Sequence, residues 1–189
     1  MSSEPMAIPA GLVVLVGPPA SGKTSFVREL VAQGRLDPEA VVSSDEIRAE
    51  FFADETADAA SHAADARIFD ERDRRIIDRL AAGRIAVAES TNVTQQARAR
   101  LVAIAERFGA PVTVLRFPQG EADLLGQNEE RSRDDVTAAD VRAYAAVMGR
   151  EANTARLRAE GAVLVYDVPG RGQGVTPAEA ARRFTVGRV

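Results

Sequence analysis

Short apolar runs alternate with amphipathic stretches along the 189 residues of the chain. Apolar positions between the runs recur at helical spacing, most clearly over 61–82, where they form one stripe. Five runs predict strands, at 12–16, 40–42, 85–88, 112–115 and 162–166. The first run is apolar throughout, which is typical of a strand buried on both faces of a parallel sheet. The alternation predicts an α/β fold in three layers, a five-stranded parallel sheet with helices on both faces.

Capping residues and glycines set the expected helix boundaries. A helix over 25–33 ends at Gly34, and another begins at Ser43 or Ser44 and reaches about residue 52. Further helices are expected from Thr94 to Gly109, over 120–128, from Thr137 to about Glu160, and from Thr176 onward. We interpret 11–189 as a single domain with a small helical lid at about 120–150, and 1–10 as a flexible leader.

The stretch after the first strand carries the strongest signal of function. It reads Gly17-Pro18-Pro19-Ala20-Ser21-Gly22-Lys23-Thr24 and matches the phosphate-binding loop G-x-x-x-x-G-K-[ST]. Such a loop directs backbone N–H groups and a helix N-terminus at a phosphate chain. Lys23 would reach the β- and γ-phosphates, and the Thr24 hydroxyl would hold Mg²⁺. We therefore predict a nucleoside triphosphate site with Mg²⁺, formed by Gly17, Ala20, Ser21, Gly22, Lys23, Thr24 and Ser25.

Polar residues also follow the second and third strands. Ligands of open α/β sheets bind beyond the carboxyl ends of the strands, so these residues are expected in the same cleft. Asp45 and Arg48 lie three positions apart on the first turns of the second helix. They suit a base that accepts a hydroxyl proton and an arginine that holds the acceptor. A capped helix start with an incidental ion pair is the alternative. After the third strand come Glu89, Thr91 and Asn92.

Composition narrows the possible partners. The net charge is −4, which argues against a surface that coats nucleic acid but leaves room for a small basic site that grips one strand end. The chain has no cysteine, no run of about eighteen apolar residues and no signal sequence at its start. These features fit a cytoplasmic protein that does not associate with membranes. The sequence predicts no oligomeric state.

Taken together, these motifs resemble the kinase module of bacterial polynucleotide kinase-phosphatase. The resemblance rests on the phosphate loop, on Ser43-Ser44-Asp45 with Arg48, and on Ser90-Thr91-Asn92-Val93, and extends to Asn128, Arg131 and Arg133. It covers about residues 11–160 and implies transfer of the γ-phosphate of ATP to a 5′-hydroxyl of DNA or RNA. No phosphatase or ligase module follows, so we expect a stand-alone kinase.

The resemblance also implies roles for single residues. Asp45 matches the general base, Arg48 the acceptor-binding arginine, and Lys23 and Thr24 the phosphate and metal ligands. Arg131 and Arg133 fall where the lid arginines clamp the transferring phosphate, an interaction that can be worth about 10³–10⁵ in rate. We also expect Asn128 to contact the nucleotide, Thr91 and Asn92 to contact the acceptor, and Asp45 and Glu89 to hold Mg²⁺ with Thr24. Two positions depart from the family's pattern, because Glu89 and Gln127 stand where the family has Asp and Arg.

The sequence is also compatible with other functions. Many small kinases of this fold place an acid and an arginine after the second strand, so a nucleoside, sugar or antibiotic is an alternative acceptor. A hydroxymethylated base in DNA, the substrate of phage-type kinases, is another. A nucleotide-binding switch without an acceptor is the non-enzymatic alternative, although a switch requires neither Asp45 nor arginines in a lid.

Overall fold

The computed structural model describes residues 4–53, 62–131 and 136–187. Its main sheet is parallel, with the spatial order β3-β4-β2-β5-β6. This confirms the predicted five-stranded sheet, with strands at β2 (Leu12–Val16), β3 (Val41–Ser43), β4 (Ala86–Glu89), β5 (Val112–Arg116) and β6 (Ala162–Asp167).

Strand β2 occupies the centre of the sheet, as its run of apolar residues predicts. All five of its residues are buried, and it pairs with β4 on one side and β5 on the other. A central strand of this kind is covered on both faces, so neither face carries a polar residue. The phosphate loop therefore follows the central strand of the sheet, at its carboxyl end.

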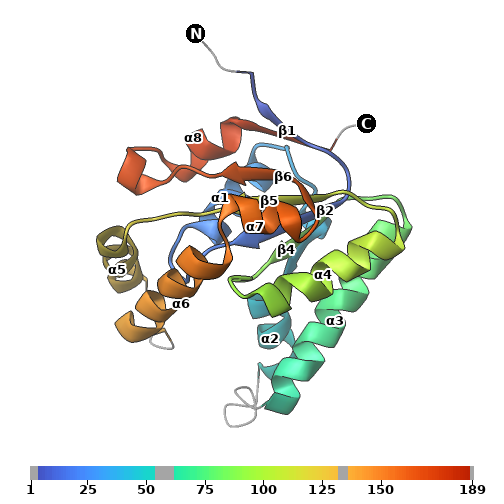
Figure 1. Cartoon of the computed structure of the whole chain (residues 1–189), viewed down its shortest axis with the longest axis horizontal. Coiled ribbons are helices and arrows are strands. Elements are labelled where there is room, and N and C mark those ends of the chain that lie inside the picture. The colour runs from blue at the N-terminus through green and yellow to red at the C-terminus, as the bar shows by residue number, and fades with distance from the viewer. Residues whose placement is uncertain (1–3, 54–61, 132–135, 188–189) are drawn as a thin grey trace.

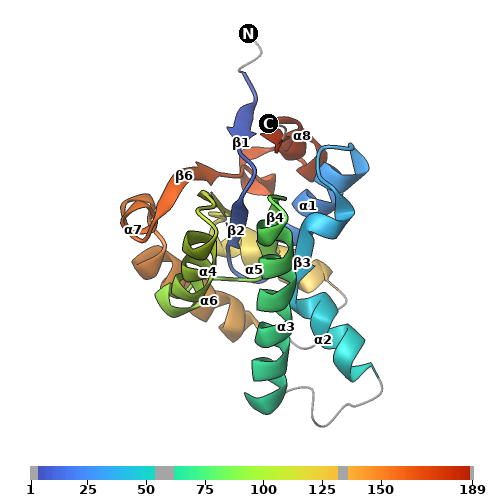
Figure 2. The ribbon, with the colours of Figure 1, turned by 90° about the vertical axis from the view of Figure 1, so that its right-hand side faces the viewer.

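Helices cover both faces of the sheet. One face packs against α2 (Ser44–Phe52), α3 (His62–Ala81), α4 (Gln95–Arg107), α6 (Ala138–Glu151) and α7 (Thr154–Ala159). The other packs against α1 (Lys23–Ala32) and α8 (Pro177–Arg182). Figure 2 shows α4 and α7 on one side of β2 and α1 and α8 on the other. The three predicted layers are thus confirmed.

The helix expected from Thr137 to about Glu160 is in fact two helices. Thr137 does cap α6, through a capping box with Asp140, but α6 ends at Glu151 and α7 begins at Thr154. Asn153 breaks the continuity, because its side chain accepts a hydrogen bond of 3.0 Å from the Arg156 N–H and so starts a new helix. The expected single helix was wrong, and α6 alone belongs to the lid region.

The expected flexible leader is also corrected for part of its length. Met6–Ile8 forms strand β1, which pairs in parallel with β7 (Phe184–Val186), and Ile8 is buried. The pairing places β1, β7 and α8 on the same face of the sheet as α1 (Figure 1). Two short 3₁₀ helices lie at Pro38–Ala40 and Arg171–Gln173. Across the described part of the chain, every helix is too short or too polar to cross a membrane.

Helices α5 (Glu121–Glu130) and α6 pack against each other in the region where the sequence predicts a lid. They lie at the opposite side of the molecule from α3, as Figure 1 shows at its lower left. The carboxyl ends of β2, β3 and β4 lead directly into the phosphate loop, into α2 and into the segment 90–94. The fold therefore brings the motif-bearing segments to one edge of the sheet.

Candidate active site

The phosphate loop has the backbone that its sequence predicts. Ala20 and Gly22 have positive φ values of 66° and 94°, so the chain turns back on itself just before α1. A side chain at Gly17 would lie 2.6 Å from the Ser21 hydroxyl and 2.9 Å from the Phe117 Cβ, so this position accepts only glycine. These constraints explain the two motif glycines by shape, independently of any ligand.

Lys23 lies inside this loop. Its ammonium donates to the carbonyl oxygens of Gly17 and Pro18, at 2.9 and 2.7 Å, and its side chain is 9% exposed. Burial lowers the pKa of Lys23 from 10.5 to about 7, although the charges of Glu89 and Asp45 oppose the shift. The charge of Arg131 lowers the pKa further.

The next residue, Thr24, is held by Glu89. The Thr24 hydroxyl donates a 2.5 Å hydrogen bond to Oε1 of Glu89, which is buried at the end of β4. Burial raises the pKa of Glu89, and the bond from Thr24 partly offsets this. Ser25 follows on the first turn of α1 and is exposed, as Thr24 is.

The oxygen atoms of Thr24 and Glu89 fit Mg²⁺. Both are hard ligands, and a cation beside Glu89 would stabilise the charge that burial disfavours. Within the described residues, no group of three or more His, Cys, Asp or Glu side chains forms a complete metal cage. Mg²⁺ usually keeps waters and binds phosphates beside one or two protein ligands, a role open to Thr24 and Glu89.

Asp45 lies on the first turn of α2, whose start is fixed by a cap. The Ser43 hydroxyl accepts a 3.3 Å hydrogen bond from the Glu46 N–H, so Ser43 rather than Ser44 is the capping residue. Asp45 is exposed, and its charge acts on both Lys23 and Glu89. The cap therefore fixes the start of the helix that carries the candidate base.

Arg48 points to α3, where it forms an ion pair with Asp65. Both side chains are about two-fifths exposed, so the pair is open to solvent. Asp65, which lies near the start of α3, was not among the site residues predicted from the sequence. In the sequence, Asp65 is only an acidic residue near the start of a predicted helix, and nothing there indicates that it pairs with Arg48. The structure thus shows Arg48 paired with α3, and its contact with an acceptor stays a prediction.

Asn92 and Thr91 support the start of the phosphate loop. Asn92 has φ 47° and is buried, and its amide donates to the Leu15 carbonyl at 2.9 Å. The Thr91 carbonyl accepts a 3.0 Å bond from the Gly17 N–H. A residue as buried as Asn92 ties strand ends together, and contact of either residue with an acceptor stays a prediction.

The lid contributes Arg131 and Asn128. Arg131 is half-buried at the end of α5, close enough for its charge to act on Lys23. The Asn128 amide donates to the Val136 carbonyl at 3.0 Å, while its Oδ1 is buried and has no partner among the described residues. That oxygen suits the predicted nucleotide contact. Arg133 lies outside the described residues.

The sheet order, the phosphate loop after the central strand and the helical pair α5–α6 define a P-loop kinase fold. Residues 12–151 match the AAA domain family, and the chain belongs to that family. None of the curated proteins compared with the chain matches it.

Three solved structures share the fold. A chain of the Pnkp1/Rnl/Hen1 RNA repair complex aligns with a TM-score of 0.64 and 18% identity, covering 79% of this chain and 46% of that one. This protein thus spans about half the length of that relative. A gluconokinase from Sinorhizobium meliloti aligns at 0.59 and 15% identity, covering 92% and 89% of the two chains. Shikimate kinase from Acinetobacter baumannii aligns at 0.55 and 14%, covering 92% and 90%.

Proposed function

We propose that this protein is an ATP-dependent phosphotransferase that moves the γ-phosphate to a hydroxyl group. One observation carries the proposal. The ammonium of Lys23 is buried inside the phosphate loop, and the next residue, Thr24, donates to the buried carboxylate of Glu89 at the end of β4. A phosphate-binding lysine thus lies next to a hydroxyl and a carboxylate that suit Mg²⁺, as phosphoryl transfer requires. The charges of Asp45 on α2 and of Arg131 at the end of α5 also act on the pKa of Lys23, which supports their proposed roles.

In the proposed reaction, the loop amides and Lys23 hold the β- and γ-phosphates of ATP. Asp45 accepts the proton of the acceptor hydroxyl, whose oxygen bonds to the γ-phosphorus as the bond to the β–γ bridging oxygen breaks and ADP leaves. Arg131, with Arg133, stabilises the charge that spreads over the transferring group. Bound Mg²⁺ would neutralise phosphate charge, held by Thr24 and Glu89 with Asp45 nearby.

For the acceptor, we propose a 5′-hydroxyl end of DNA or RNA. The sequence Ser43-Ser44-Asp45 with Arg48 supports it, and so does the similarity in fold to a chain of an RNA repair complex. In this proposal Arg48 and Thr91 contact the 5′ end of the nucleic-acid strand. The chain would then act on a strand end without coating the rest of the nucleic acid.

A small hydroxyl compound is a second candidate, and the charges around the cleft favour it. Together, helices α2 and α3 carry eight acidic residues and six arginines. Several of these arginines pair with these acids, as in Arg48–Asp65 and Arg75–Glu50. Nucleic-acid affinity depends on arginines and lysines that neutralise phosphates. A surface whose arginines pair with acids would therefore bind a long strand weakly. The gluconokinase and shikimate kinase structures, each covered to about 90%, have the same fold.

Transfer of labelled γ-phosphate from ATP to a panel of acceptors tests both candidates. The panel holds 5′-hydroxyl DNA, 5′-hydroxyl RNA, hydroxymethyluracil DNA, nucleosides and sugars. We expect label on a 5′-hydroxyl strand. Label on a small compound alone would replace the polynucleotide by the second candidate. Slow ATP hydrolysis that no acceptor accelerates would contradict the kinase and support a nucleotide-binding switch.

The variant Asp45→Asn tests the proposed base. We expect turnover to fall by about 10²–10⁴-fold, the usual contribution of general base catalysis, while ATP affinity is retained. Glu46→Gln is the matched control, because it removes a neighbouring charge of the same helical turn and keeps the backbone bond to Ser43. Equal losses in the two variants would show that only the charge of the turn matters, and Asp45 would not be the base.

A further inference from the structure

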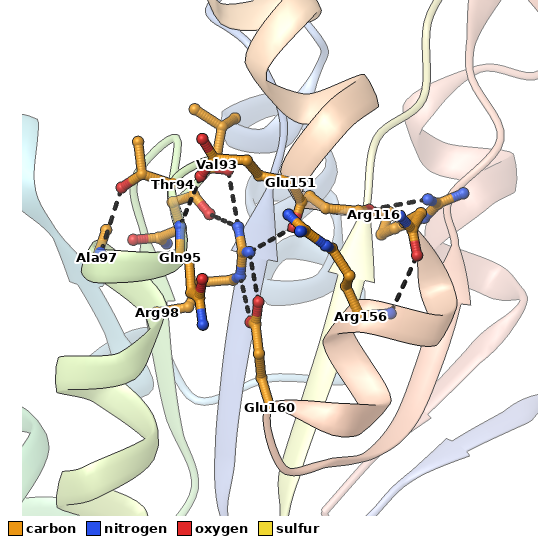
Figure 3. A network of polar contacts seen from close by, with 12 residues as sticks. Val93, Thr94, Gln95, Ala97, Arg98, Arg116, Glu151, Arg156 and Glu160 are labelled. Carbon is orange, nitrogen blue, oxygen red and sulfur yellow. Dashed lines mark hydrogen bonds and ion pairs between the residues drawn. The ribbon is translucent and has the colours of Figure 1, made fainter.

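Three arginines surround the C-terminal end of lid helix α6. Arg156 Nη1, Arg98 Nη2 and Arg116 Nη1 donate to three successive carbonyl oxygens, those of Arg150, Glu151 and Ala152, at 3.4, 2.7 and 2.9 Å. The last carbonyls of a helix have no partner within it, and its dipole favours cations there. We call Arg98, Arg116 and Arg156 the arginine collar (Figure 3).

Arg98 is the member of the collar with the most contacts. Its side chain is 2% exposed. Its Nε and Nη2 bind both carboxylate oxygens of Glu160, at 2.7 and 2.9 Å, and its Nη1 donates to the carbonyls of Asn92 and Val93, at 3.0 and 2.8 Å. With the bond to Glu151, all five guanidinium N–H donors are used. A lysine has three donors and no planar fork, so it cannot replace this set.

The two carbonyls in the loop after β4 connect Arg98 to the phosphate loop. The side chain of Asn92 donates to the Leu15 carbonyl, near the end of β2, and the preceding residue, Thr91, accepts from the Gly17 N–H. The segment that Arg98 grips is therefore the one that holds the first residue of the phosphate loop.

A second contact joins the same two helices in the opposite direction. The Glu151 carboxylate accepts a 3.0 Å bond from the Gln95 N–H at the N-terminus of α4, while Arg98 of α4 caps the C-terminus of α6. Each helix end thus receives the charge that its dipole favours. The base of the lid is fixed twice to α4.

We propose that Arg98 is a positioning residue for phosphoryl transfer. It fixes the C-terminal end of α6, which packs against α5, to Asn92 and Val93. Arg131 at the end of α5 and the phosphate loop are thereby aligned on one support. The proposal rests on the proposed function for its effect on turnover. Alignment of this kind acts on the reaction step more than on ATP binding, because the phosphate loop itself remains intact.

The variant Arg98→Lys tests this role, since it keeps a buried cation and loses the fork. We expect kcat to fall by about tenfold to a hundredfold, the cost of a misplacement of about 1 Å, with the Kd for ATP changed by less than about threefold. Arg116→Lys is the matched control. Arg116 also donates to the base of α6 and pairs with a carboxylate, that of Asp167, through Nε and Nη2, but it has no recorded bond to 91–93 among the described residues. We expect its kcat to change little.

Hydrogen exchange supplies a readout that does not depend on transfer. In Arg98→Lys we expect faster amide exchange in both 91–95 and 149–153, and in Arg116→Lys in 149–153 alone. If both variants lose stability alike and keep kcat, or if 91–95 is unaffected by Arg98→Lys, Arg98 does not couple the two segments. If the unaltered protein phosphorylates no acceptor, the proposed function fails, while the exchange pattern still decides the coupling.

Discussion

The two sides of the candidate active site are built differently. The phosphate-donor side is a loop of eight consecutive residues whose shape is set by backbone conformation and close packing, at Gly17 and Gly22 above all. The proposed acceptor side consists of side chains on α2 and α3 that pair with one another, as Arg48 does with Asp65. The donor side is therefore fixed locally in the sequence, and the acceptor side depends on contacts between helices.

This difference explains why the kinase reaction is better supported than its acceptor. ATP presents the same triphosphate in every kinase, so one loop can serve proteins with many substrates. The acceptor varies between kinases, and the contacts proposed for it here are made by surface side chains whose ion pairs a substrate could displace. Surface pairs of this kind contribute only about 0–1 kcal/mol each, so exchange with a substrate costs little.

The largest effect is expected from Arg131→Ala, which removes charge from the donor side. Turnover should fall by about 10³–10⁵-fold, because an arginine on the transferring phosphate acts mainly in the transition state. The Kd for ATP should change far less. Arg142→Ala is the control, since Arg142 lies on the same lid but forms an exposed pair with Glu121. A change in ATP affinity alone would mean that Arg131 binds the nucleotide without assisting transfer.

A smaller effect is expected on the acceptor side from Arg48→Gln. The KM for the acceptor should rise by about tenfold to a hundredfold, since hydrogen bonds to charged groups contribute about 1.5–3 kcal/mol, while the KM for ATP stays constant. Asp65→Asn keeps Arg48 and removes its partner, so it should leave the acceptor KM unchanged or lower it. Steady-state kinetics with each substrate varied in turn measures both. An equal rise in the two variants would show that Arg48 only braces α3.

The same contrast separates what the sequence could predict from what it could not. The strands, the phosphate loop and the start of α2 follow from local patterns, and the structure has them within a residue or two. The strand β1 could not be predicted, because three residues form a strand only with a partner at the far end of the chain. Helical spacing continues across Asn153, so only its cap reveals the break between α6 and α7.

Contacts between distant elements account for the rest of the site. Arg98 resembles any surface arginine of an amphipathic helix, and its five bonds come from segments that only the fold brings together. The contact of Asn92 with the acceptor stays a prediction, and the hydrogen bond from its side chain to the Leu15 carbonyl could not be predicted from the sequence. The sequence could predict roles that follow from residue type within a motif. It could not predict roles that arise because the fold buries a residue among distant segments, as it does Arg98 and Asn92.

The smallest effect we predict is a pH dependence of ATP affinity that follows from the pKa of Lys23. It should affect the phosphate-donor side and not the acceptor side. This pKa is about 7 because burial outweighs the charges of Glu89 and Asp45. A bound triphosphate favours the charged ammonium, so above about pH 7 nucleotide binding must take up a proton. ATP affinity should therefore fall as the pH rises from 7, by at most about tenfold per pH unit.

Calorimetric titrations with ATP between pH 6 and pH 9, in buffers of different ionisation enthalpy, measure both the affinity and the proton uptake. Lys23→Arg supplies the control, because a guanidinium stays charged throughout this range and should abolish the slope. The acceptor KM should not follow the same slope, since Arg48 also stays charged. Unchanged ATP affinity across this range in the unaltered protein would mean that Lys23 is already charged before the nucleotide binds. The phosphate loop would then carry the positive charge of Lys23 before ATP binds, in addition to its preformed shape.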